Sequence, residues 1–360
     1  MVGYYFAQFR HELGNVGWNE SRGRHGEGRP IVSSITGTKG DNPKMSFTKL
    51  MTATAASLML MAGAASAGDP ASCQKVRLSD IGWTDITATT GTASVLLTGL
   101  GYKPEIKLLA EEVTYQGLKN KDLDVFLGDW EPSMASVIKP YMDDKSVEQL
   151  PPNLEGAKYT LAVPKYVADG GIHDFADIAK FKDKLDGKIY GIEPGNDGNK
   201  LILDMISKGA FGLKDFKLIE SSEQGMLAQV TRAGKKNEWI VFLGWEPHPM
   251  NVKYDMVYLT GGDDYFGPNF GGATVHTNVR AGYTQECPNV GKLLANLKFE
   301  LKLENEMMGK ILDDGKDGPA AAKEWLQAHP EVLDKWLAGV TTFDGGDGLA
   351  AVKKELGLSS

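Results

Sequence analysis

Short apolar runs alternate with stretches of helical periodicity through the central part of the chain. The runs that predict buried strands are residues 76–81, 106–109, 123–127, 159–163, 188–192, 216–219 and 239–243. Helical patterns separate several of them, at residues 84–99, from 113 onward and at 199–209. Strands that alternate with helices are typical of parallel βαβ units, so the pattern predicts an α/β fold.

The pattern becomes strongly helical from about Cys287 onward. Pro288 suits a first helical turn, residues 292–308 carry leucines at helical spacing, and Pro319 suits the start of a further helix. Because this region has no strands of its own, we expect it to return and pack on the first part of the chain.

The whole pattern predicts two α/β lobes joined by two crossings of the chain, with a ligand cleft between them. Lobe I comprises residues 74–155 and 275–358, and lobe II comprises residues 156–274. The crossings are expected near residues 151–158 and 271–277. Such an architecture closes around a small ligand by hinge motion.

One segment nearly recurs: residues 125–134 and 241–250 each contain an apolar run, a Gly, and a Trp followed by Glu-Pro. An apolar run that ends in Gly indicates a buried strand stopping at a turn. The Trp beyond it then lies at the carboxyl end of a strand, where open α/β sheets bind ligands. Trp130 and Trp245 are therefore expected to face one cleft, and paired Trp rings favour a quaternary ammonium ligand.

Three further residue types near the predicted strand ends are candidates. Trp83 also follows a predicted strand and a Gly. Three other tryptophans lie inside periodic apolar segments and are expected in the core: Trp239, Trp325 and Trp336. Asp85 begins a helix, where the dipole stabilises a carboxylate, and it can also point into the cleft; both can hold at once. From the residues alone, Tyr159 is as well explained by packing as by ligand contact.

The loop 194–198 lies between a predicted strand and a helix and offers backbone N–H groups to a polar ligand. Asn196 within it is either a helix cap or a ligand-facing amide. Both readings remain open at this point.

Catalytic and metal motifs do not accompany these candidates. Glu131 and Glu246 precede prolines and could suggest acid/base work, but the nucleophile and zinc signatures are missing, so we expect turn residues there. Residues 313–324 resemble a calcium loop, although Gly stands at its third position and Pro319 interrupts it. We therefore predict no enzyme activity, no cofactor and no metal.

The first 67 residues change the charge balance. Residues 45–67 have the order of a signal peptide, a short positive region, an uncharged apolar run and an A-x-A site, which predicts export to the periplasm as a soluble protein. We interpret residues 1–44 as an upstream extension from an early start codon, with a disordered tail as the alternative. Without residues 1–67 the net charge falls from −8 to −11, which disfavours nucleic acid as a partner.

Only two cysteines occur, Cys73 and Cys287, and both follow the predicted signal peptide. An even number in an oxidising compartment favours one disulfide, with two buried thiols as the alternative.

Five stretches make the chain recognisable: residues 80–85, 128–132, 158–161, 193–198 and 244–247. With these, the chain from residue 68 onward resembles the periplasmic substrate-binding proteins of ABC importers for quaternary amines. Within that group it looks most like the choline-binding proteins of alphaproteobacterial choline importers. The resemblance implies the type II periplasmic binding protein fold, a monomer, and a permease in the inner membrane as partner. The segment before Met45 departs from the family pattern.

The resemblance also implies roles for individual residues. It assigns Trp83, Trp130, Tyr159 and Trp245 to an aromatic box around a trimethylammonium group, and it supports the Cys73–Cys287 disulfide. It further implies that Asp85 and Asn196 address the hydroxyl end of the ligand.

The chemistry of the candidates favours choline over glycine betaine. A betaine carboxylate needs donors such as Arg, but the segments quoted above contain no Arg. Asp85 would repel a carboxylate and accept a hydroxyl, and a buried mismatch of this kind costs several kcal/mol. We therefore expect choline as the ligand, acetylcholine if the cleft has room, and betaines more weakly. A betaine receptor of the same class and a hydrolase of choline esters or phosphocholine remain the alternatives.

Overall fold

The structure is a computed structural model of the 360-residue chain, and it describes residues 68–358. The predicted extension at residues 1–44 and the predicted signal peptide at residues 45–67 lie outside the described residues.

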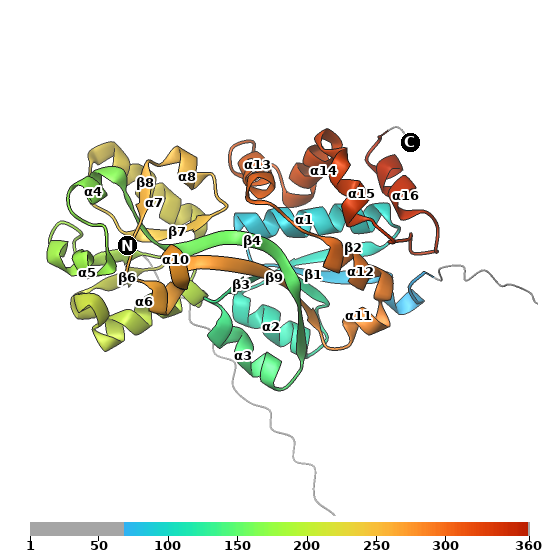
Figure 1. The fold of residues 1–360 in the computed structure, drawn as a ribbon, viewed down its shortest axis with the longest axis horizontal. Helices are drawn as coiled ribbons and strands as arrows, with labels where there is room; N and C mark the ends of the chain where they lie inside the picture. The colour runs from blue at the N-terminus through green and yellow to red at the C-terminus, as the bar shows by residue number, and fades with distance from the viewer. Residues whose placement is uncertain (1–67, 359–360) are drawn as a thin grey trace, which may run out of the picture. The chain divides into compact units, whose positions relative to one another are not determined.

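The strands of the described part form one sheet with the order β2-β1-β3-β9-β4-β7-β5-β6, and β8 pairs with β4 (Figure 1). Their bounds are β1 Lys75–Asp80, β2 Lys103–Leu108, β3 Val125–Glu131, β4 Val147–Pro164, β5 Lys188–Tyr190, β6 Lys217–Ile219, β7 Phe242–Glu246, β8 Met256–Tyr258 and β9 Gly272–Arg280. β1 runs parallel to β2 and β3, and β5 runs parallel to β6 and β7. The predicted α/β class with parallel units is therefore confirmed.

Helices lie between and after these strands. The longer ones are α1 Thr84–Gly99, α2 Glu111–Lys119, α3 Ala135–Asp143, α6 Asp197–Lys208, α7 Glu223–Lys236, α12 Pro288–Asn296, α13 Leu301–Leu312, α14 Gly318–Ala328 and α16 Gly348–Glu355. The shorter ones are α4 Lys165–Asp169, α5 Phe175–Ile178, α8 Met250–Lys253, α9 Asp263–Phe266, α10 Pro268–Gly271, α11 Tyr283–Glu286 and α15 Leu333–Trp336. The helix expected at residues 84–99 is confirmed, and Pro288 and Pro319 lie in first turns as expected.

The single helix expected over residues 292–308 is wrong, because α12 ends at Asn296 and α13 begins at Leu301. Between them the chain is pulled toward the sheet: the N–H of Phe299 donates to the carbonyl of Asn153 at 2.7 Å. A buried tertiary hydrogen bond thus interrupts a pattern that is helical by spacing alone.

β4 and β9 are long antiparallel partners that connect β3 on one side of the sheet with β7 on the other. The apolar pattern predicted only residues 159–163 of β4, because its first half contains Pro151, Pro152 and Gly156. Register shifts accommodate this half, between Gln149 and Ala157. The two crossings expected near residues 151–158 and 271–277 fall in these strands, and the lobe boundaries stay a prediction.

The C-terminal helices α13, α14 and α16 pack on α1, as expected for a region without its own sheet (Figure 1). α1 is buried along nearly its whole length. Close approach to α14 depends on Gly91, where a Cβ would lie 2.4 Å from the carbonyl carbon of Gly318. Thus a small residue decides how near the two helices lie.

The disulfide predicted from the cysteine count is present: Cys73 is bonded to Cys287, with their Cα atoms 5.7 Å apart. It joins the segment before β1 to the turn before α12, 214 residues later.

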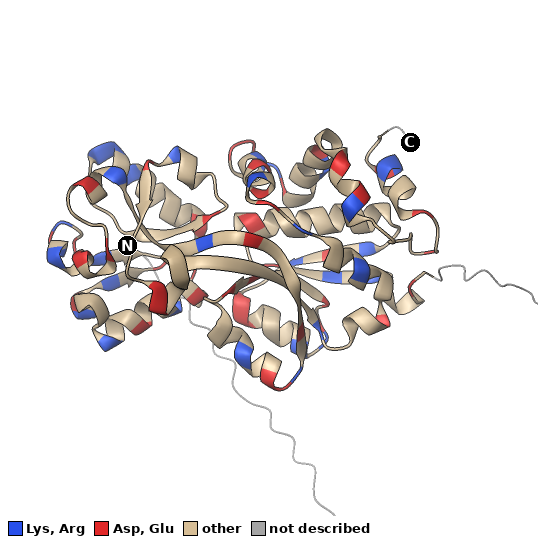
Figure 2. Cartoon of the chain, viewed as in Figure 1, with Lys and Arg blue, Asp and Glu red and all other residues tan. Residues whose placement is uncertain are grey.

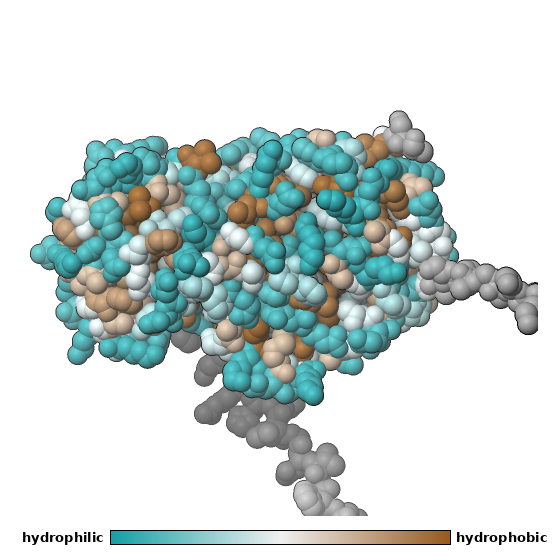
Figure 3. All heavy atoms as spheres, in the orientation of Figure 1, coloured by the Kyte–Doolittle hydropathy of each residue, from teal (hydrophilic) through white to brown (hydrophobic). Residues whose placement is uncertain are grey.

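The surface carries charges of both signs, interspersed along helices and strand ends (Figure 2). The face seen in Figure 3 is mainly hydrophilic, with separate hydrophobic spots. Between residues 68 and 358, every helix is too short or too polar to cross a bilayer.

Candidate ligand-binding site

One small, buried cavity of about 20 Å³ is lined by side chains from five parts of the fold. Its lining residues are Trp83, Asp85, Trp130, Tyr159, Ile192, Asp197 and Trp245. Five of the six residues predicted as ligand-binding are therefore brought together, although they are spread over more than 160 positions. The sixth, Asn196, is adjacent to the cavity but not in its lining.

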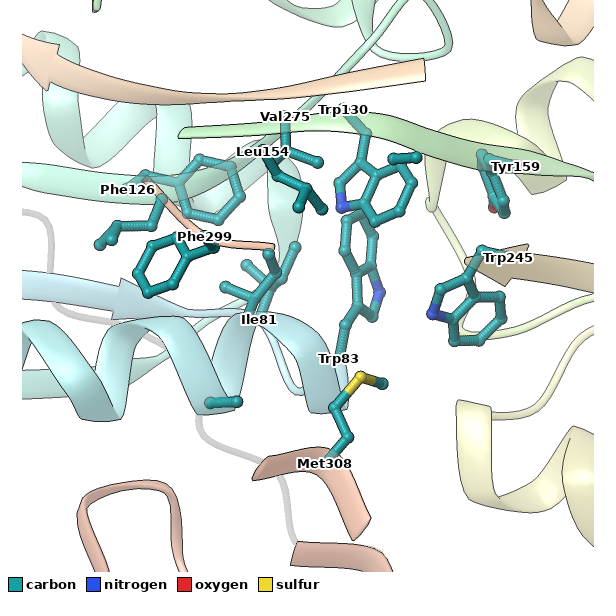
Figure 4. Close-up of a cluster of buried hydrophobic side chains, with 14 of the residues drawn as sticks. Ile81, Trp83, Phe126, Trp130, Leu154, Tyr159, Trp245, Val275, Phe299 and Met308 are labelled. Atoms are coloured by element: carbon teal, nitrogen blue, oxygen red, sulfur yellow. The ribbon is translucent and has the colours of Figure 1, made fainter. Parts of the chain in front are cut away.

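Strand pairing places two of the rings side by side. Tyr159 on β4 lies opposite Trp245 on β7, with ring centroids 6.2 Å apart and planes at 81°. Trp130, at the end of β3, has its ring 6.0 Å from that of Tyr159. In Figure 4 the rings of Trp83 and Trp130 lie on one side of a gap, with Tyr159 and Trp245 on the other. The arrangement is a box of aromatic faces and edges.

The box is closed to solvent. Trp83 and Tyr159 are 6% exposed, and Trp130 and Trp245 are 3% exposed. Because the rings that would hold a ligand are this deeply buried, a ligand can enter only when the elements around the cavity move apart.

The Gly and Trp of the repeated segment lie inside strands, not beyond them. β3 continues through Trp130 to Glu131, and β7 continues through Trp245 to Glu246. The expected turn at the Gly is therefore wrong. A Cβ at Gly128 would lie 2.7 Å from the side chain of Ile86, and one at Gly244 would lie 2.9 Å from Met256, so these glycines provide room for packing.

Asp85 lies in the first turn of α1 and also faces the cavity, so both readings of this residue hold. It is 1% exposed, and its Oδ2 accepts a hydrogen bond from Nε1 of Trp130 at 3.1 Å. Burial, together with the nearby charge of Glu223, raises the pKa of Asp85 to about 8. No basic side chain of the cavity lining compensates this carboxyl group.

Asn196 is the N-cap of α6. Its Oδ1 accepts the N–H of Asn199 at 3.0 Å and the hydroxyl of Tyr159 at 3.2 Å, while its Nδ2 donates to Asp197 at 2.8 Å. The cap reading thus matches the geometry, and ligand contact by Asn196 stays a prediction. Its present contacts hold two lining residues, Tyr159 and Asp197, in place.

Sequence reasoning missed Asp197 and Ile192, which line the cavity, and Glu193, which accepts Nε1–H of Trp83 at 2.7 Å. Asp197 lies in the loop 194–198 that had been singled out, and Glu193 directly precedes it. The adjacent polar residues Asn196 and Asp197 could not be ranked without side-chain directions. Burial raises the pKa of Asp197 and also that of Glu111, which accepts the Asp197 N–H at 3.2 Å.

The electrostatic character of the cavity follows from its lining. Its described residues include two aspartates and no Lys, Arg or His. Glu131, next to Trp130, is also protonated more readily than usual, because burial and then Asp129 raise its pKa to about 7. Within residues 68–358, no cluster of His, Cys, Asp and Glu is arranged to hold a metal ion. Aromatic faces and uncompensated carboxyls together select a compact organic cation.

This chain is similar in sequence and structure to substrate-binding proteins of ABC transporters. Residues 74–328 match the family described as the substrate binding domain of ABC-type glycine betaine transport systems. An ABC-transporter choline binding protein solved with choline is 64% identical over 80% of this chain and 100% of its own, with a TM-score of 0.79. The unliganded, semi-closed form of such a protein is 65% identical with the same coverage and a TM-score of 0.74. Lactococcal OpuAC complexed with glycine betaine is 30% identical over 73% of this chain and 98% of its own, with a TM-score of 0.66.

Proposed function

Because this chain belongs to the family of substrate-binding domains of ABC-type glycine betaine transport systems, we propose that it is the choline receptor of an ABC importer. In this role it binds and releases its ligand unchanged and is not an enzyme. The observation that carries the proposal is the cavity lining, which combines four aromatic rings with two aspartates and no basic side chain. The 64% identity to a protein solved with choline supports the same ligand.

Choline fits the charges better than glycine betaine does. Both carry a trimethylammonium group that the rings can hold by cation–π attraction, at roughly 0.5–2 kcal/mol per ring. Betaine adds a carboxylate, which Asp85 and Asp197 would repel inside a buried cavity. Choline adds a hydroxyl, which can donate to either aspartate.

Acetylcholine is a weaker candidate because of its size. The closed cavity is small, with about 20 Å³ of free space between the side chains that line it. The acetyl group would have to occupy space that Ile192 and the rings now limit. It would also replace the hydroxyl donor by an ester.

Capture is proposed to follow from hinge motion. Residues 74–155 and 275–358 carry Trp83, Asp85 and Trp130, and residues 156–274 carry Tyr159, Asp197 and Trp245. Bending of β4 and β9 would separate the two groups, admit choline and then rejoin them around it. The receptor is proposed to act as a monomer in the periplasm and to deliver choline to a permease in the inner membrane.

Titration calorimetry with choline, acetylcholine, glycine betaine and carnitine tests the ligand. We expect tight choline binding and at least about tenfold weaker binding of glycine betaine, since a buried like-charge contact costs more than 1.4 kcal/mol. Equal or reversed affinities for choline and glycine betaine would contradict the choline assignment. They would favour the betaine receptor, which the family match allows.

A further inference from the structure

The first helix of the fold has no cap from its own segment. α1 begins at Thr84, and its N-cap residue, Trp83, makes no side-chain capping bond. Instead, the N–H of Thr84 donates to Oε2 of Glu223 at 2.9 Å, and the Thr84 hydroxyl donates to Oε1 at 2.5 Å. A carboxylate 139 residues away in the chain thus caps this helix.

Glu223 is held from its other side by His248. Nδ1 of His248 accepts the N–H of Met250 at 2.8 Å, so the ring proton lies on Nε2, which faces Oε1 of Glu223 at 3.1 Å. The His248 ring packs edge-on against Trp245, with centroids 4.9 Å apart. Glu223 therefore links His248, which packs against Trp245, to the segment that carries Trp83 and Asp85.

These contacts form where the chain must separate for a ligand to enter. Thr84 lies in the proposed lobe I, while Glu223 and His248 lie in the proposed lobe II. All three are almost completely buried, with exposed fractions of 2%, 1% and 1%. Since the cavity beside them is sealed, opening it by hinge motion pulls Glu223 away from Thr84.

We propose that Glu223 is a positioning residue that holds the cage closed by capping α1 across the cleft, and that it controls how long the ligand stays bound. This inference rests on the proposed hinged receptor. In the closed form the carboxylate of Glu223 accepts charge-assisted hydrogen bonds from Thr84. The positive N-terminal end of the α1 dipole also attracts this carboxylate. In the open form water solvates Glu223 and the end of α1, so the bonds stabilise only the closed form.

A second hydrogen bond, from Trp83 to Glu193, also joins the two proposed lobes. It is less suited to holding the cavity closed. Glu193 is only partly buried, so water can replace its partner at little cost. Glu223 has no such alternative while the cavity is closed, because its two oxygens are shared among Thr84 and His248.

The test compares Glu223→Gln with Thr84→Val. Glutamine preserves volume, but its amide group would face the Nε2–H of His248 and leave one Thr84 donor with a weaker acceptor. Valine removes only the Thr84 hydroxyl. Thr92→Val is the matched control, because the Thr92 hydroxyl is equally buried on the same helix but contacts only residues of the proposed lobe I: Ala88 at 2.9 Å and Sδ of Met307 at 3.4 Å. Glu238→Gln controls for the change in net charge at an exposed position.

Stopped-flow Trp fluorescence should show choline leaving Glu223→Gln roughly 10- to 100-fold faster than wild type, as expected for losing a buried charged hydrogen bond. Association should stay within about twofold, since it starts from the open form. Thr84→Val should show the same effect more weakly, and both controls should match wild type. The double variant should release choline no faster than Glu223→Gln, because the hydroxyl acts through the carboxylate.

The melting temperature of the ligand-free protein separates this role from a general structural one. It should be unchanged in Glu223→Gln, while the rise in melting temperature on adding choline should shrink. Unchanged dissociation in both Glu223→Gln and Thr84→Val would overturn the inference, as would equal losses of stability with and without ligand. If the wild type fails to bind choline, that result contradicts the proposed function and not the role of Glu223. The dissociation rates of whichever amine the wild type binds would then decide the role of Glu223.

Discussion

At the scale of single residues, the cavity combines strong aromatic attraction with carboxyl groups that are costly to ionise. Asp85 is buried beside Trp130, and burial together with the charge of Glu223 raises its pKa. Glu304 also lies close enough to Asp85 for the two charges to interact. The pKa of Glu304 is raised well above its usual value by burial and then by Asp85. A cation in the cavity would lower the cost of ionising Asp85, so ligand and proton compete for this site.

The affinity for choline should therefore depend on pH through Asp85. Because the pKa of Asp85 is about 8 in the closed cavity, the group is mostly neutral there at pH 6. The affinity should rise by up to about tenfold per pH unit toward pH 8 and then level off, because the cation binds the ionised form better. Calorimetry across this range on wild type and Asp85→Asn checks it, and the variant should give a flat profile. An equal slope in both proteins would assign the dependence to Asp197 or Glu131.

The same raised pKa has a consequence for stability without ligand. A carboxyl group with a raised folded-state pKa contributes stability that is fully present below its unfolded pKa of about 4 and is lost as the pH rises toward 8. The closed form without ligand should thus be less stable at pH 8 than at pH 5. Choline should reduce this difference.

Replacement of Trp245 by Ala should weaken choline binding by at least about tenfold, because a desolvated cation–π contact of about 2 kcal/mol and its packing are lost. Trp239→Ala is the control, since Trp239 is partly buried against Phe181 and outside the cavity. Calorimetry on both variants measures the effect. If Trp245→Ala kept wild-type affinity, Trp245 would not be part of the cage.

At the scale of elements, the loop before α6 fixes the position of Tyr159. Gly198, in the first turn of α6, leaves room for the Tyr159 ring: a Cβ there would lie 2.0 Å from the hydroxyl oxygen. Asn196, the cap of the same helix, accepts that hydroxyl. The start of α6 and the middle of β4 therefore form one unit of the site.

Gly198→Ala should displace the Tyr159 ring and weaken choline binding by roughly tenfold or more, since overpacking a rigid site costs about 1–3 kcal/mol. Gly234→Ala on α7 is the matched control. A Cβ there meets nothing within 4 Å, so it should leave affinity unchanged and raise stability by about 0.5–1 kcal/mol. Calorimetry and thermal unfolding of both variants check this. Wild-type affinity in Gly198→Ala would show that Tyr159 can shift without cost.

Elements differ in how well their own residues predict them. α1 was predicted to its ends because glycines with positive φ, Gly82 and Gly101, stand close to both of its ends. The first half of β4 was not predicted, because Pro151, Pro152 and Gly156 argue locally against a strand, and β9 was not predicted as a strand at all. Pairing with distant strands overcomes those preferences through hydrogen bonds that no local window contains.

At the scale of the whole molecule, the Cys73–Cys287 disulfide closes a very long loop. Cys73→Ser with Cys287→Ser should lower the free energy of unfolding by about 2–5 kcal/mol, because the bond restricts the unfolded chain. Choline affinity should stay near that of wild type, since neither cysteine lines the cavity. Denaturant unfolding and calorimetry measure the two quantities, with reduced wild type as the control. A loss of affinity as large as the loss of stability would link the disulfide to the site.

Some properties of this protein were determined by its sequence alone. Alternating strands and helices predicted the α/β class, and the cysteine count predicted the disulfide. The pattern of apolar run, Gly and Trp predicted three walls of the cavity, although Trp130 and Trp245 lie inside their strands and not beyond them. Each depends on local periodicity or on residue type, which the chain carries without folding.

Other properties were decided only by the tertiary structure. The glycines of the repeat serve close packing and not turns, Asp197 faces the cavity while Asn196 caps a helix, and Glu223 meets Thr84 across 139 residues. Side-chain direction and long-range hydrogen bonds arise only when distant segments compete for the same buried space, and that competition has no signature in the local pattern.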